Sequence, residues 1–185
     1  MHLDGKQIRV LAHPLRSRLL GRLRMDGPAT ATRLAEALGT NTGATSYHLR
    51  QLAEVGLVLD EPGAGHGRER WWRAAHDVSG WRRGAYTNDD NAAAAVDWLH
   101  NFGLNVLVER VEAWHRAADS EPRPWREATE FADHVLNLTA AQLRSLTAEL
   151  EGVIERHRRA AIEAADPDAR QVLLYLYAMP RLAQS

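Results

Sequence analysis

The sequence contains no cysteine in its 185 residues. A chain without cysteine forms no disulfide bond and offers no thiolate to a metal ion or to a redox switch. It also shows no basic segment followed by an apolar export signal, and Asp97 interrupts the longest apolar stretch, over 92–108. We therefore expect a globular protein that stays in the cytoplasm and makes no contact with a membrane.

Motifs of common catalytic sites are also missing from the sequence. There is no glycine-rich phosphate loop before a helix, no nucleophile elbow and no His-x-x-x-His pair. The glycine cluster over 63–67 falls between two predicted strands, where a hairpin turn explains it better than a phosphate-binding loop. The sequence therefore predicts that the protein is not an enzyme and needs no cofactor.

Lysine is almost absent, since Lys6 is the only one and arginine supplies the remaining positive charge. The net charge of -1 hides an asymmetry: residues 1–86 contain 13 Lys/Arg and 8 Asp/Glu, whereas the remainder contains 10 and 16. A basic first half and an acidic second half favour nucleic acid as one partner and protein as the other. With a polar, glycine-containing linker over 76–91, this asymmetry predicts a DNA-binding domain over 1–86 and a dimerisation domain over 87–185.

Residues 30–75 predict a helix, a tight turn, a second helix and a β-hairpin, in that order. The first helix ends at Gly39, which readily adopts the left-handed conformation of a helix C-terminus. The second helix covers 42–55 and has a buried face with side chains at steps of three and four residues. Residues 57–75 form two strand-like segments around a glycine-rich turn. Two helices precede this unit, a short one before residue 12 and a clearer one over 14–25.

The outer face of the helix over 42–55 carries hydroxyl groups, one aromatic ring and one guanidinium, in place of the Glu and Lys of an ordinary solvated surface. Such groups suit base edges and phosphates. The residues concerned are Thr42, Ser46, Tyr47 and Arg50. Arg68 and Arg70 lie two residues apart on the second strand, so both face one side and can reach a phosphate or the minor groove.

Five short motifs within residues 8–75 resemble, in order, those of ArsR-type winged helix-turn-helix regulators. They are His13-Pro-Leu-Arg16, Leu34-Ala-Glu-Ala-Leu-Gly39, Ser46-Tyr-His-Leu-Arg-Gln-Leu52, Gly56-Leu-Val58 and Gly67-Arg-Glu-Arg-Trp-Trp-Arg73. Proteins of this family are bacterial dimeric transcription regulators, usually repressors. The resemblance therefore implies a homodimer that binds double-stranded DNA, with the helix over 42–55 at the DNA, His66 to Arg70 on the wing, and His48 facing inward.

This interpretation assigns separate roles to the polar residues. Two symmetry-related helices would enter successive major grooves of an inverted repeat, about one helical turn apart. Phosphate contacts are expected from Arg16 or Arg18 and from Arg68 and Arg70, whereas Ser46, Tyr47 and Arg50 are expected to contact bases. The alternative is a winged-helix adaptor that binds protein, which would need apolar anchors on this face instead.

The sequence departs from the metal-sensing relatives, because their cysteine pairs are absent. Some relatives bind zinc or nickel through Asp and His on a helix after the wing, and this chain has Asp97, His100, Glu112 and His115 there. Each pair is three residues apart and could meet its symmetry mate in an antiparallel dimer helix. The spacing differs from the family pattern, so we predict ordinary surface side chains and no metal, with a metal-responsive repressor as an alternative.

Residues 92–118 predict a long helix that is apolar around more than half of its circumference. Such a helix needs a partner on each side, which favours a role as the principal dimer helix. The predicted dimer contacts are Leu99, Phe102, Val106, Leu107, Val111 and Trp114. Aromatic residues here and at Trp125 could instead line a pocket for an unknown small-molecule effector, although core packing is the preferred interpretation.

The last part of the chain predicts a helix between two strands. Thr139 and Gln142 form a capping box for a helix over 140–164. Residues 132–138 and 171–178 are predicted strands joined by a right-handed β-α-β crossover, and this tail resembles that of longer members of the regulator family. The predicted fold class is mainly α with small β: a winged helix-turn-helix, then a dimerisation region of long helices with a short two-stranded element.

Overall fold

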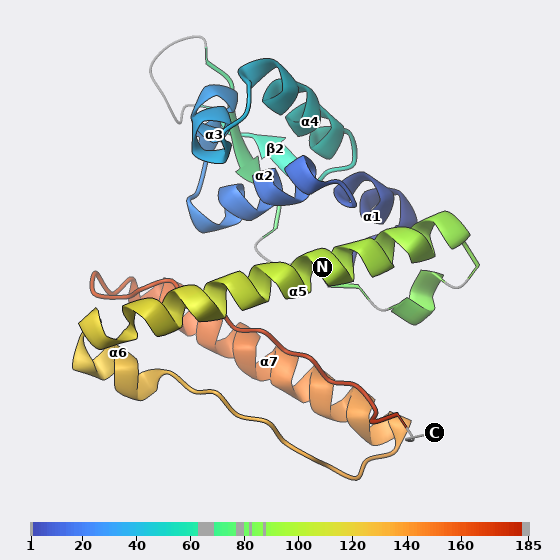
Figure 1. Cartoon of the computed structure of the whole chain (residues 1–185), viewed down its shortest axis with the longest axis vertical. Coiled ribbons are helices and arrows are strands. Elements are labelled where there is room, and N and C mark those ends of the chain that lie inside the picture. Colours follow the sequence, from blue (N-terminus) through green and yellow to red (C-terminus); the bar gives the residue numbers. More distant parts are fainter. Residues whose placement is uncertain (1, 63–68, 77–79, 82, 87, 183–185) are drawn as a thin grey trace. The chain divides into compact units, whose positions relative to one another are not determined.

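The computed structural model of the chain describes residues 2–62, 69–76, 80–81, 83–86 and 88–182. It divides into two compact units, one ending at Arg126 and the other starting at Glu127 (Figure 1). This division does not follow the boundary predicted between residues 86 and 87, because the helix after that boundary packs on the N-terminal elements. Whether 1–86 and 87–185 fold as separate domains stays a prediction.

The first unit begins as a winged helix. Its elements are α1 (Gly5–Leu11), α2 (Pro14–Met25), β1 (Ala29–Thr30), α3 (Ala31–Leu38), α4 (Thr42–Glu54), β2 (Val58–Asp60) and β3 (Trp71–Ala74). Figure 1 shows α2, α3 and α4 around the small sheet. The sheet is antiparallel in the order β1-β3-β2, with Val58 opposite Ala74 and Ala29 opposite Trp72. The helix, turn, helix and hairpin order predicted from the sequence is confirmed.

Local signals in the sequence explain where the first helices start. Asp4 and Gln7 form a capping box at α1, in which each side chain accepts a hydrogen bond from the other residue's backbone N–H. The His13 side chain caps α2, and Pro14 occupies the first helical position, where its missing N–H costs nothing.

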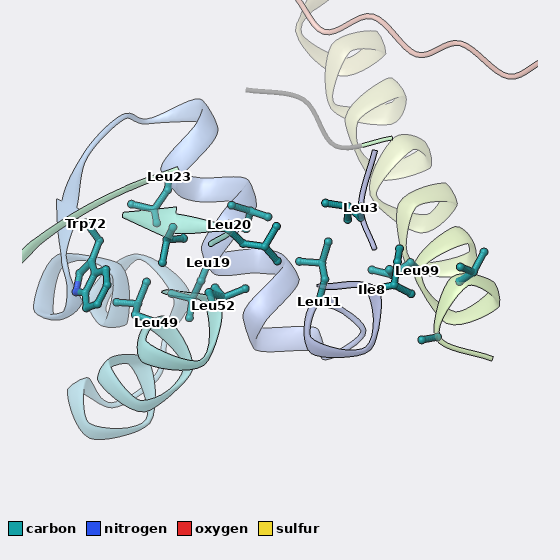
Figure 2. Close-up of a cluster of buried hydrophobic side chains, with 14 of the residues drawn as sticks. Leu3, Ile8, Leu11, Leu19, Leu20, Leu23, Leu49, Leu52, Trp72 and Leu99 are labelled. Carbon is teal, nitrogen blue, oxygen red and sulfur yellow. The ribbon is translucent and has the colours of Figure 1, made fainter. Parts of the chain in front are cut away.

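Aliphatic side chains from α2, α4 and the sheet fill the core of the winged helix. Figure 2 shows Leu19, Leu20 and Leu23 of α2 close to Leu49 and Leu52 of α4, with Trp72 of β3 at the edge of the cluster. Leu19, Leu49 and Leu52 are fully buried. Burying a leucine side chain stabilises a fold by about 1.5–3 kcal/mol, so this cluster fixes α4 against α2.

The first unit continues through η1 (Arg83–Tyr86), α5 (Asp90–Ala117), η2 (Ala118–Ser120) and the start of α6 (Arg123–Ala128), which ends in the second unit. The N-terminal half of α5 packs on α1 and buries Ala92, Ala95, Val96 and Leu99. Figure 2 shows Leu99 beside Ile8 of α1. The Tyr86 hydroxyl donates a hydrogen bond to the Leu3 carbonyl, and Arg9 forms an ion pair with Asp89, the N-cap of α5. These contacts attach the first half of α5 to the winged helix.

In the part of the chain that the structure describes, α7 (Ala140–Ala164) is the one helix that lies entirely within the second unit. Its predicted capping box is confirmed, with Thr139 and Gln142 bonded to each other's backbone N–H. The predicted strands over 132–138 and 171–178 are wrong: neither segment forms a strand or pairs with another. β-branched and aromatic residues make a strand only when a neighbour supplies the ladder and a layer covers the apolar face, and here Val135 is 90% exposed and Leu174 is 69% exposed.

The fold class is therefore confirmed in outline as mainly helical with one small antiparallel sheet, and corrected for its C-terminal strands. None of the helices among the described residues combines the length and the apolar run that a membrane span requires.

Candidate nucleic-acid interface

A tight turn joins α3 to α4. Gly39 ends α3 with a φ of 62° and a ψ of 40°, and its N–H donates to the carbonyls of Ala35 and Glu36. The Thr40 N–H follows with a bond of 2.9 Å to the Ala35 carbonyl. The Asn41 side chain then accepts from the Ala44 N–H at 2.8 Å and starts α4. The turn into α4 is thus fixed by backbone bonds from Gly39 and Thr40 and by the side-chain cap of Asn41.

The predicted recognition residues share the outer face of α4. Thr42, Ser46 and Arg50 are four residues apart and lie on successive turns, and the Arg50 Nε donates to the Ser46 carbonyl at 3.1 Å. Thr42 and Arg50 are exposed, Ser46 is partly buried, and the Tyr47 side chain is 55% exposed. All four lie outside the core of α4, with Thr42, Ser46 and Arg50 on successive turns and Tyr47 farther around the helix.

The two arginines predicted on α2 are tied to neighbouring helices. Arg16 is partly buried, and its Nε donates to the Val10 carbonyl in α1. Burial lowers the pKa of Arg16, and the nearby Tyr47 acts in the opposite direction. Arg18 is exposed and donates to the Leu38 carbonyl at 3.3 Å. Arg18 is therefore the better placed of the two for a phosphate, whereas Arg16 mainly joins α1 to α2.

The wing is described only at its base. His66 and Arg68 lie outside the described residues, so their predicted contacts stay predictions. Arg70 is exposed, pairs through Nε with Asp60 Oδ2 at 2.8 Å, and lies 4.1 Å from the Trp72 ring centroid. A guanidinium held by a carboxylate and an aromatic face has few conformations to lose when it binds an anion.

Arg33 is a candidate contact that the sequence analysis missed. It is exposed on α3, and its guanidinium lies 4.7 Å from the ring centroid of Trp71 on β3. The signal was present, because successive residues of a strand point to opposite faces, so Trp71 and Trp72 cannot both enter the core. The tryptophan outside the core needed a partner, and Arg33 provides it.

Two histidines meet where α2 starts beside α4. The ring centroids of His13 and His48 are 4.5 Å apart at an interplanar angle of 38°, and the Tyr47 ring meets His48 edge-on at 5.2 Å. Arg16 acts electrostatically on both imidazoles, and Tyr47 acts electrostatically on Arg16. We call these four residues the His13–His48 cluster. His48 is partly buried, in keeping with the inward orientation that the family resemblance implied.

Comparison with known families agrees with this geometry. Residues 11–61 match a protein-family model described as a helix-turn-helix domain. The chain contains a helix-turn-helix domain. The match runs from the end of α1 through β2, and no curated protein matches the chain. A helix-turn-helix domain supports DNA as a partner and a role in transcription regulation, whereas the ArsR-type assignment stays a prediction.

The predicted dimer residues fall into two groups on α5. Leu99 is 3% exposed in the core of its own unit, so its side chain packs within the chain and does not face a partner. Phe102 lies near the middle of α5, and Val106, Leu107, Val111 and Trp114 lie in its second half; all five are partly buried. Leu104 is 38% exposed and Val108 is 54% exposed on the same stretch. The Trp98 and Phe102 rings stack at 5.1 Å, and Trp98 packs against the core.

The candidate metal residues also lie on α5. The Asp97–His100 pair is separated from the Glu112–His115 pair by 15 residues, which is about 22 Å along a helix, so one chain cannot bring them together. Glu112 lies 3.7 Å from Arg116. Among the described residues, no group of three or more His, Asp or Glu side chains is gathered as a metal site requires.

Proposed function

We propose that the protein is a dimeric transcription regulator, of repressor type, that binds an inverted repeat of double-stranded DNA through α4. The outer face of α4 carries the proposal: Thr42, Ser46 and Arg50 occupy successive turns outside a core that holds Thr45 and Leu49 at 0% exposure. A helix anchored so firmly on one face can enter a major groove as a rigid body.

The proposed DNA contacts are of two kinds, to base edges and to phosphates. Arg50 can bond the two acceptors of a guanine edge, and the Ser46 hydroxyl and Tyr47 ring lie beside it on α4. Exposed arginines lie on neighbouring elements: Arg18 on α2, whose guanidinium reaches the end of α3, Arg33 on α3, and Arg70 at the base of the wing. Phosphate contacts of this kind fix register and supply salt-dependent affinity, whereas base contacts supply specificity.

The second half of α5 supports the dimer. The helix has 28 residues, so it is about 42 Å long and extends well past the residues that pack on α1. Large apolar side chains are exposed on it and in the second unit, among them Val108, Val135 and Leu174, and a second copy could cover them. A second copy placed there would present two α4 helices to two half-sites.

A selection of duplexes from a random pool, followed by footprinting, tests the proposal. We expect an enriched inverted repeat whose half-sites are about one helical turn apart. The matched control is Arg156→Ala, at an exposed position of α7. It removes the same charge as Arg50→Ala, but far from α4 in the sequence, and should leave the selected duplex sequences unchanged. Failure of the full-length protein to bind any duplex at low ionic strength would overturn the proposal and favour the adaptor.

A further inference from the structure

The two histidines of the His13–His48 cluster belong to none of the contacts proposed for DNA. Its two imidazoles come from different elements, since His13 is the N-cap of α2 and His48 lies in the middle of α4. Tyr47, an exposed residue of the recognition face, contacts the edge of His48. The cluster therefore links the start of α2 directly to the side of α4 that is proposed to meet DNA.

Protonation of either neutral ring at Nδ1, which would make it an imidazolium, is unfavourable. The His13 Nδ1 accepts a hydrogen bond from the Leu15 N–H at 3.2 Å, so a proton there would remove the cap of α2. The His48 Nδ1 is buried and has no hydrogen-bond partner among the described residues. Protonation there would bury an unpaired N–H donor, which is more costly than an unpaired acceptor on a neutral ring.

The charges around the cluster oppose protonation too. The positive charge of Arg16 in α2 lowers the pKa of both rings. Tyr47 of α4 interacts electrostatically with Arg16, and the Val10 carbonyl of α1 accepts a hydrogen bond from the Arg16 Nε. No carboxylate among the described residues contributes to the pKa of either histidine. Burial lowers the pKa of both rings from the usual 6.5, and for His48 the positive charges of His13 and Arg16 lower it further.

We propose that His13 and His48 are positioning residues that hold α4 and Tyr47 in the DNA-binding arrangement only while both rings are neutral, so that acid weakens DNA binding. This inference rests on the proposed function. Two imidazolium groups in contact beside Arg16 repel one another, and the cap of α2 is lost at the same time. The start of α2 then separates from α4, and the fraction of molecules that can bind DNA falls.

The direction of the pH effect follows from the lowered pKa values. A neutral pair contributes its full stabilisation above the unfolded pKa of about 6.5, and the contribution is lost as the pH falls through the pKa of the folded state. DNA phosphates act oppositely on exposed histidines, because they favour the protonated form and strengthen binding in acid. A fall in affinity on acidification therefore distinguishes this cluster from ordinary surface histidines.

The experiment measures DNA affinity by fluorescence anisotropy at constant salt from about pH 7.5 to about pH 5.5, the range in which histidine titrates. It uses the full chain and a duplex obtained by selection. The test variant is His13→Asn with His48→Gln, in which Asn keeps an N-cap acceptor and neither side chain can take a proton. The matched control is His157→Gln, an exposed histidine of α7.

For the wild type and the His157→Gln control we expect the dissociation constant to rise about tenfold across this range. The double variant should bind more weakly than the wild type near neutral pH, yet keep that affinity in acid. Nitrogen-detected NMR of the wild type should show Nε2–H tautomers for His13 and His48, with both pKa values below the usual 6.5. This readout remains if the double variant fails to fold.

Two sets of outcomes separate the inference from the proposed function. Wild-type protein that binds no duplex near neutral pH overturns both. Wild-type binding with equal pH dependence in the double variant, or binding that strengthens in acid only when both histidines are present, overturns the inference alone. A His48 that titrates with an unshifted pKa in the NMR experiment also overturns it.

Discussion

Neighbouring residues on α4 have opposite environments, and this alternation determines what each substitution does. Thr45 is fully buried and its Oγ1 has no hydrogen-bond partner among the described residues, while Ser46 next to it carries the carbonyl that accepts from Arg50. A buried hydroxyl without a partner has lost its bonds to water and gained nothing in exchange. Stability and recognition therefore depend on separate residues of one helix.

Thr45→Val should stabilise the protein. Valine has the shape of threonine without the hydroxyl, so it fills the same space and removes the unpaired polar atom. We expect the free energy of unfolding to rise by about 1 kcal/mol, measured by urea denaturation. Thr42→Val, at the exposed start of the same helix, is the control and should give no gain. A less stable Thr45→Val protein would mean that the hydroxyl has a partner.

Arg50→Ala and Arg18→Ala should fail in different ways. Loss of a base contact should cost about 1–3 kcal/mol at one position of the site and relax the preference there. Loss of a phosphate contact should weaken every duplex alike and reduce the slope of log affinity against log salt by about 1. Binding selections measure the base preference of both variants, and salt titrations measure their salt dependence. Two variants with the same effects would contradict the assignment of Arg50 to bases and Arg18 to phosphates.

At the scale of elements, the boundaries that sequence could predict were those fixed by adjacent residues. Gly39, the Asn41 cap and the Thr139–Gln142 capping box each act within a few residues, so the helix-turn-helix and the start of α7 were predicted correctly. The strand expected over 171–178 was wrong because its partner had to come from elsewhere in the chain.

The candidate site was predictable to a similar extent. The outer face of α4 follows from helical periodicity and could be inferred residue by residue. The His13–His48 contact and the Arg33–Trp71 contact join residues of different elements, so only packing brings them together. Arg16 shows the same limit: its sequence position suggested a phosphate contact, and the fold directs its Nε to the Val10 carbonyl.

Gly39→Ala and Gly21→Ala should change stability in opposite directions. Gly39 ends α3 at a φ of 62°, which strains any residue with a Cβ, whereas Gly21 lies inside α2 with open space where a Cβ would be. We expect Gly39→Ala to cost about 1 kcal/mol and Gly21→Ala to add about 0.5–1 kcal/mol of unfolding free energy. Thermal and urea unfolding of the two variants test both signs, and a neutral Gly39→Ala would show that the turn can change its conformation.

At the scale of the whole molecule, charge and apolar surface are distributed unevenly. Positive charge predominates in residues 1–86, while exposed apolar side chains such as Val135, Leu174 and Leu182 gather near the end of the chain. The second unit has one complete helix among its described residues and buries little apolar surface by itself. Both features fit a protein that uses its N-terminal part for DNA and its later part for association with a second copy.

Val106→Glu should separate dimerisation from DNA contact. Val106 lies in the second half of α5, beyond the residues buried against α1, so a carboxylate there should disturb an interface between copies more than the winged helix. We expect sedimentation equilibrium to show a dimer for the wild type and a dimer at least about 100-fold weaker for the variant. Because both half-sites must be engaged at once for avidity, affinity for the inverted repeat should fall toward that for a single half-site. Glu109→Gln, an exposed position on the same helix, should change neither quantity. A wild-type chain that sediments as a monomer while it binds the full repeat would rule out the dimer and leave α4 to act alone.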